Sequence, residues 1–196
     1  MVDTKVCNYV LCSERSQINF TISHFVLSKV SGHFSRFFGC ALISEMESVD
    51  YAFLKIDVTS IRTGNSIRDR NLMKRSYFNS SEYRYIECEV KDLDLKKTLD
   101  HPVDFHVRIK EMEEVIPFNV FVISANSDMI NLRITGKIKT QDFGLKWPSP
   151  IKAGLMVGSE ANLSIFLSLF RGQTTIENLG NNPSQSSSVH VASHRK

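Results

Sequence analysis

The chain has 196 residues, of which 42% are hydrophobic and 23% are charged, so it is long enough to bury a substantial core in one or two domains. Its formal net charge is +3, and the basic residues are spread along the chain without a long run of like charge. This charge is too small for the electrostatic footprint of a nucleic-acid-binding protein, so nucleic acid is not an expected partner.

The N-terminal region contains only a short apolar patch, and no basic segment followed by a long apolar one, so no signal peptide is visible. No segment reaches the roughly 20 apolar residues of a membrane-spanning helix. The four cysteines, Cys7, Cys12, Cys40 and Cys88, lack the spacing of a zinc site, and we expect no bound metal. We expect a soluble protein in a reducing compartment, where these thiols stay free.

Alternation of apolar and polar residues is the dominant pattern, and it is typical of strands with one buried face. In chain order it predicts strands at 17–23, 54–59, 103–109, 116–122, 132–138 and 161–169, with weaker segments near 31–44 and 84–91. Between strands lie stretches that favour short turns, namely EMES, KDLD, EMEE and ANSD.

The sequence therefore predicts an all-β protein, an antiparallel barrel of about eight strands, because crossover helices are missing and closure removes exposed strand edges. One short helix is expected at about 66–76, with Leu72 and Met73 facing inward. The barrel domain is expected to span 1–171. The remainder, 172–196, is rich in Ser, Asn, Gln and Gly, and we expect a disordered polar tail.

A barrel of this size is either filled by its own side chains or hollow enough for one apolar ligand, and the pattern alone leaves both open. The inward phases of the predicted strands supply the candidate lining residues: Phe20, Ile22, Leu54, Ile56, Val58, Phe105, Val107, Phe118, Val120, Ile134 and Ile165.

Several short motifs recur in an order that resembles the YceI-like family of lipocalin-like barrels, which bind polyisoprenoids and other long-chain lipids. They are His24 after an alternating strand, Gly32-x-Phe34, Ser60-x-x-Thr63-Gly64-Asn65, Arg68-Asp69 before Leu72, Tyr77-Phe78 before Tyr83, and Asp142-Phe143-Gly144. The resemblance covers about residues 9–171. It implies a hollow barrel that holds a long apolar ligand, with no cofactor required.

The resemblance also gives the region around 66–78 a function, as a plug and lid at the barrel mouth. Candidates for contacts at the mouth or with a ligand head group are His24, Arg68, Asp69, Leu72, Phe78 and Asp142. Two structural alternatives stay open: Asp69 caps the helix while Arg68 ties the turn to neighbouring strands, and His24 is a satisfied core residue.

Departures from the family pattern include Tyr9, Cys12 and Arg15 near the start, and Asn71, Asn79 and Thr140 in later motifs. Many relatives carry a secretion signal, and its absence here suggests a cytoplasmic member. The periplasm is the alternative if a leader was removed.

No motif of a known enzyme class accompanies these residues, and most Asp and Glu side chains lie on outward phases. We therefore expect no catalytic residues and a non-enzymatic function, the binding, storage or transport of a polyisoprenoid, isoprenoid quinone or fatty-acyl derivative. The alternatives are a filled-barrel interaction module and, less favoured, an enzyme acting on a lipid. A homodimer is compatible with the sequence.

Overall fold

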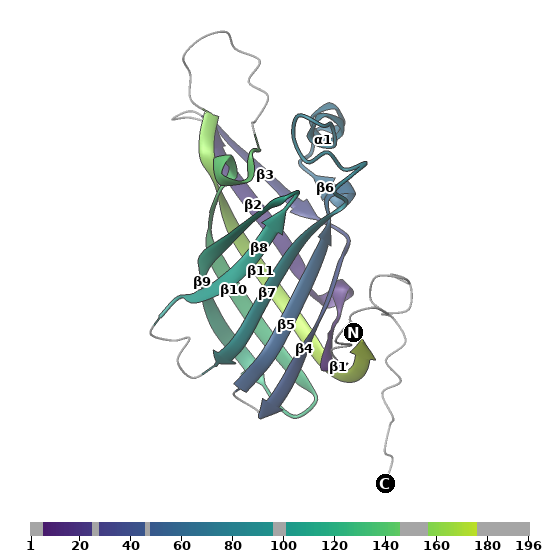
Figure 1. Ribbon diagram of the computed structural model, residues 1–196, viewed down its shortest axis with the longest axis vertical. Helices are drawn as coiled ribbons and strands as arrows, with labels where there is room; N and C mark the ends of the chain where they lie inside the picture. The colour runs from purple at the N-terminus through teal and green to yellow at the C-terminus, as the bar shows by residue number, and fades with distance from the viewer. Residues whose placement is uncertain (1–5, 25–27, 46–47, 96–100, 146–156, 176–196) are drawn as a thin grey trace.

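The structure is a computed structural model, and it describes residues 6–24, 28–45, 48–95, 101–145 and 157–175. Its strands form one antiparallel sheet that curves into a closed barrel (Figure 1). They are β1 (Val6–Leu11), β2 (Gln17–His24), β3 (Ser28–Phe34), β4 (Phe37–Glu45), β5 (Ser48–Asp57), β6 (Ile61–Arg62), β7 (Tyr85–Asp94), β8 (Val103–Ile109), β9 (Met112–Ala125), β10 (Met129–Lys139) and β11 (Val157–Thr175).

The predicted barrel of about eight strands is confirmed, because three long strands are each divided by a kink. A 3-10 turn, η1 (Ser13–Arg15), separates β1 from β2, and a second, η2 (Val58–Ser60), separates β5 from β6. Strands β3 and β4 are divided only by the two residues 35–36. Counting each divided strand once gives the eight strands of the closed barrel.

Strand β11 closes the barrel by pairing along its whole length. On one side it pairs with β10, from Met129 opposite Phe170 to Lys139 opposite Glu160. On the other side its first half pairs with β2 and its second half with β1. Each strand of the ring is thus paired on both sides over at least part of its length, and the inward side chains form one buried interior.

The kink after β5 is built around Asp57, which is 4% exposed. Its carboxylate accepts hydrogen bonds from the amide of Thr59 at 2.9 Å and its hydroxyl at 2.6 Å, and pairs with Arg36 at 3.2 Å and Arg84 at 3.1 Å. Burial acts to raise the pKa of the carboxyl, but the bonds from Thr59 and Arg84 hold the pKa of Asp57 below its ordinary value. One carboxylate thus links the segments before β4, after β5 and before β7.

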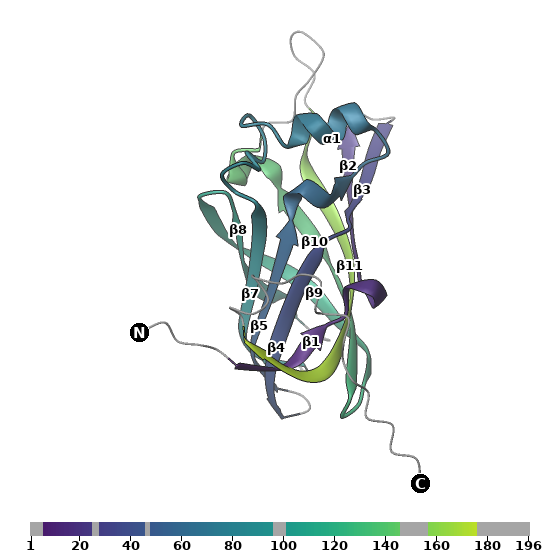
Figure 2. The ribbon, with the colours of Figure 1, turned by 90° about the vertical axis from the view of Figure 1, so that its right-hand side faces the viewer.

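The start of β1 and the end of β11 lie against the outer face of β4 (Figure 2). Here Cys7 and Cys40 form a disulfide with a Cα–Cα distance of 5.9 Å, packed against Phe38. The expectation that all four thiols stay free is therefore wrong for this pair. Cys7, Phe38 and Cys40 form a small cluster apart from the main core, and the spacing of the cysteines in the sequence does not reveal this contact. Cys12 and Cys88 are free.

Two boundaries differ from those expected. Helix α1 (Ser66–Leu72) ends four residues before 76, and turns continue from Met73 to Phe78. Strand β11 continues past 171 to Thr175 because its last residues pair with Val6 and Cys7. The rest of the expected tail, 176–196, lies outside the described residues. Within the described part of the chain, no helix has the length and apolar character needed to span a membrane.

Replacing Asp57 by Asn should lower the free energy of unfolding by about 1.5–3 kcal/mol, because the hydrogen bonds and ion pairs of a charged group are lost. A depressed pKa stabilises the fold above the unfolded-state value of about 3.9, and this contribution disappears as the pH falls through the folded-state pKa. Urea unfolding of the wild type and Asp57→Asn between neutral pH and pH ~3 should therefore show a difference that shrinks in acid. Exposed Asp104→Asn is the control. A pH-independent difference would contradict the charged role.

Replacing both Cys7 and Cys40 by Ser should lower the free energy of unfolding by about 3–4 kcal/mol, since the bond closes a loop with a sequence separation of 33 residues. Urea unfolding with and without dithiothreitol measures this. Reductant should destabilise the wild type and leave the double variant unchanged. Equal midpoints of the wild type under both conditions would show that the bond contributes nothing.

Candidate functional site

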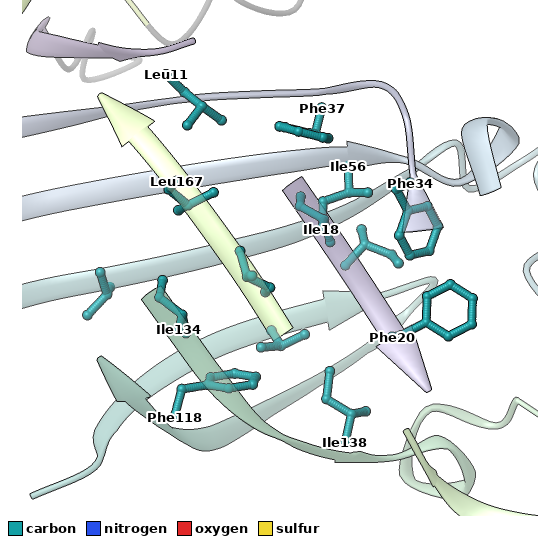
Figure 3. Packing of buried hydrophobic residues seen from close by; sticks show 14 of the residues in the cluster. Leu11, Ile18, Phe20, Phe34, Phe37, Ile56, Phe118, Ile134, Ile138 and Leu167 are labelled. Atoms are coloured by element: carbon teal, nitrogen blue, oxygen red, sulfur yellow. The ribbon is translucent and has the colours of Figure 1, made fainter. Parts of the chain in front are cut away.

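The interior of the barrel is the candidate site, because it contains apolar space that side chains do not fill. Figure 3 shows inward side chains from many strands, including Ile56, Phe118, Ile134 and Leu167, arranged around the axis. Within the described residues a larger cavity of about 140 Å³ occupies the body of the barrel, and every residue in its wall is apolar or a cysteine.

Most of the predicted lining residues form the wall of this larger cavity: Leu54, Ile56, Phe105, Val107, Phe118, Val120, Ile134 and Ile165. Phe20 and Ile22 instead line a second cavity of about 70 Å³. Val58 lies in neither wall, although it is buried. It is the first residue of the η2 turn, where the alternation that pointed it inward has ended. Val58 packs in the main hydrophobic core, outside the walls of these two cavities.

Two glycines make room for large rings on the inner wall. A methyl group at Gly32 would lie 2.5 Å from the Phe20 ring, and one at Gly136 would lie 2.3 Å from the Phe118 ring. Phe118 in turn packs edge-on against Phe105 at 5.3 Å between centroids. The rings therefore lie over backbone that has no side chain, instead of projecting fully into the interior.

The barrel end beside α1 is closed by buried side chains. Leu72 is 0% exposed, Tyr77 3% and Phe78 6%, and all three line the smaller cavity. Burial raises the pKa of the Tyr77 phenol, so this group stays neutral. Phe143, on the 3-10 turn η4 (Thr140–Phe143), is also 0% exposed. These contacts fit the plug expected from the sequence.

Arg68 and Asp69 both bind Thr63. The guanidinium of Arg68 donates to the hydroxyl of Thr63 at 2.7 Å and to its carbonyl at 2.6 Å, and Asp69 accepts from the amide at 3.1 Å and from the hydroxyl. The helix is capped by Asn65, whose side chain accepts from the amides of Ile67 and Arg68, so the expectation that Asp69 is the cap is wrong. Both charged groups therefore hold the turn that leads into α1.

Two further candidates for contacts with a head group, Asp142 and His24, belong to other elements than Arg68. Asp142 is exposed on η4, while the neighbouring Phe143 is buried. His24 is the last residue of β2, opposite Ser28 and Val157, and its side chain lies outside what the structure describes.

Sequence reasoning missed several residues of the larger cavity, among them Phe34, Ile86, Ile109 and Leu167. Leu167 belongs to the alternation predicted for 161–169, and Phe34 to the Gly32-x-Phe34 motif, so both signals were present. Ile86 lies in the weaker strand near 84–91. Strand β1 was not predicted at all, because its residues acquire an inward and an outward side only by pairing with β11 and β4.

Cys88 is a titratable side chain in the wall of the larger cavity. Burial, with a contribution from the negative charge of Glu87, raises the pKa of the Cys88 thiol to about 12. The thiolate is thus almost absent at neutral pH, and the group behaves as a small apolar side chain rather than a nucleophile.

A closed antiparallel barrel with an apolar interior and one plugged end defines a class of small barrels built around a hydrophobic cavity. The YceI-like domain model matches residues 9–169, most of the chain, and the protein belongs to this family. A UPF0312 protein of Staphylococcus aureus strain N315 is 26% identical over 162 residues, which are 78% of this chain and 91% of the relative.

Solved structures share the fold. A polyisoprenoid binding domain from Saccharophagus degradans, described as implicated in plant cell wall breakdown, superimposes with a TM-score of 0.68 at 18% identity, covering 85% of this chain and 99% of that one. BcnA of Burkholderia cenocepacia gives a TM-score of 0.68 at 16% identity, covering 81% and 98%.

Replacing Gly136 by Ala should cost about 1–3 kcal/mol of unfolding free energy, because the new methyl group forces the Phe118 ring out of its position. Gly172→Ala is a matched control, since a methyl there meets its nearest atom at 3.5 Å, an ordinary contact. Thermal unfolding of both variants measures the difference. The double variant Gly136→Ala/Phe118→Leu should recover part of the loss, and equal losses for the two glycines would contradict the argument.

Proposed function

We propose that the protein binds one long-chain apolar molecule inside the barrel, without acting on it chemically. The observation that carries this proposal is the larger cavity, whose described wall offers only aliphatic, aromatic and sulfur groups. Such a wall favours a hydrocarbon chain, since each methylene transferred from water contributes about 0.8 kcal/mol. The polyisoprenoid binding of the Saccharophagus degradans domain supports a polyisoprenoid, isoprenoid quinone or fatty-acyl derivative as the ligand class.

The chemistry of the wall favours binding over catalysis. General acid–base catalysis needs a group that titrates near the working pH, within hydrogen-bonding distance of the reacting atoms. In the larger cavity, the titratable side chain among the described residues is Cys88, with a pKa of about 12. We infer a role in storage or transport of the ligand.

The direction of binding follows from where the interior is blocked. The α1 end is closed by the buried side chains of Leu72, Tyr77 and Phe78. The larger cavity extends away from α1 as far as Val49 and Ile130. These are the second residues of β5 and β10, two strands that begin at the barrel end opposite α1. We propose that the hydrocarbon end enters first from this opposite end, and that the head group stays there. Arg68 and Asp69 then act on the turn and not on the ligand.

The Cys7–Cys40 disulfide indicates the kind of cellular compartment in which the protein works. Bonds between cysteines persist in oxidising surroundings and are rare in the cytosol. The Cys7–Cys40 bond therefore favours the periplasm, or another oxidising compartment, over the cytoplasmic location expected from the sequence.

Organic extraction of the purified protein followed by mass spectrometry should recover about one long-chain lipid per chain. Phe118→Trp should lower this occupancy, because the larger ring fills the cavity, at a stability cost of about 1–3 kcal/mol. Phe121→Trp is the matched control, since Phe121 lies on the same strand with an exposed side chain. Repeated absence of lipid from the wild type would favour an interaction module, and unchanged occupancy in Phe118→Trp would place the lipid outside the barrel.

A further inference from the structure

Two apolar cavities adjoin inside the barrel. The larger cavity, about 140 Å³, and the smaller one at the α1 end, about 70 Å³, share five wall residues. These residues come from five different strands and so surround the axis at one level: Phe34, Ile86, Ile109, Ile138 and Leu163. We call this set the partition.

Phe34 is the aromatic member of the partition, and its position is fixed from several directions. Its ring lies 5.6 Å from that of Phe20 and 6.5 Å, edge-on, from that of Phe78, both of which line only the smaller cavity. Its backbone pairs with Ile18 and Ile61 as the last residue of β3. Aromatic pairs of this geometry add to the energy of burial, so the ring is held in place more firmly than an isolated side chain.

The backbone immediately after Phe34 is also tied down. The amide of Ser35 donates to the carbonyl of Ser60 at 3.3 Å, and the amide of Arg36 donates to its hydroxyl at 3.0 Å. Ser60 itself is 0% exposed. The bonds to Ser60 in the η2 turn therefore fix the direction of the Phe34 side chain. This direction places the ring in the walls of both cavities.

The volumes of the two cavities limit how much of a hydrocarbon chain each can hold. A dry apolar cavity of about 150 Å³ takes a ligand the size of benzene, so the larger cavity alone encloses only the end of a long chain. The apolar space that continues it is the smaller cavity, beyond Phe34. A chain that grows longer must therefore stop at the partition or displace the ring.

We infer that Phe34 and the partition set the chain length that the barrel accepts, the end of the hydrocarbon chain stopping against the Phe34 ring. This inference rests on the proposed function and adds to it a residue that determines specificity. Removing the ring joins the two cavities, and the chain end then reaches the residues beside α1.

The test measures the affinity of purified protein for two homologous series, straight-chain primary alcohols and linear polyprenols, by displacement of the dye N-phenylnaphthylamine. In the wild type, each added methylene should tighten Kd about fourfold until the chain end meets the partition, after which Kd becomes constant. In Phe34→Ala this plateau should move to longer chains in at least one series. The first chains beyond the wild-type plateau should gain about fourfold per added methylene.

Two further variants make the result specific. Phe121→Ala removes an exposed Phe from the outer face and should leave the plateau where it is. Ala161→Leu, which adds bulk to the smaller cavity alone, should abolish the shift when combined with Phe34→Ala. Phe34→Leu replaces Phe34→Ala if the latter does not fold, as judged by circular dichroism.

The possible failures can be told apart. A wild type that binds neither series overturns the proposed function, and the inference with it. A wild type with a clear plateau that stays in place in a folded Phe34 variant overturns the inference alone, since the ligand still binds but another feature stops its chain. A shift that persists in the double variant with Ala161→Leu also overturns it, because the smaller cavity is then not the space gained.

Discussion

Closure of the barrel through β11 is the constraint on which the rest of the structure depends. One strand satisfies the backbone groups of β10 on one side and those of β2 and β1 on the other. Without this double pairing the sheet would have two edges, and unpaired amide and carbonyl groups would face water or another chain. With it, the paired strands enclose the inner face. Side chains on that face must then be apolar or fully hydrogen-bonded.

Three of the long strands of the closed barrel are interrupted by a kink. Each kink interrupts the backbone ladder, and polar groups must replace the lost hydrogen bonds. At the β5–β6 kink, Asp57 and the Ser60 hydroxyl do so, and the charge of Asp57 is balanced by Arg36 and Arg84. The polar residues that are buried here therefore serve the shape of the barrel. Ser60 of the same kink also binds the backbone directly after Phe34, so this kink influences both the course of the strands and the position of the Phe34 ring.

Alternation identified the strands that carry the inward wall, because a period of two follows directly from the pleat of a strand. Alternation failed where contacts with residues distant in the sequence decide whether a side chain points inward or outward. Asp57 lies on the outward phase of the strand predicted at 54–59, since Ile56 and Val58 are assigned inward, yet it is buried in a kink. The KDLD turn signal lies inside β7, where Asp92 adopts a positive φ of 51° within the strand. The place of Phe34 in the walls of both cavities depends on packing between strands, which no local pattern encodes.

A hollow barrel is less stable than a filled one, and this difference is part of the affinity for a ligand. An empty cavity of about 140 Å³ costs about 3 kcal/mol at roughly 24 cal/mol per Å³, because the wall atoms lack contact partners on one side. The closed ladder and the Cys7–Cys40 bond allow the fold to tolerate this cost. A hydrocarbon chain that fills the space restores the missing contacts in addition to leaving water. The empty volume thus favours binding of apolar chains over the filled-barrel alternative, in which no such energy would remain to be recovered.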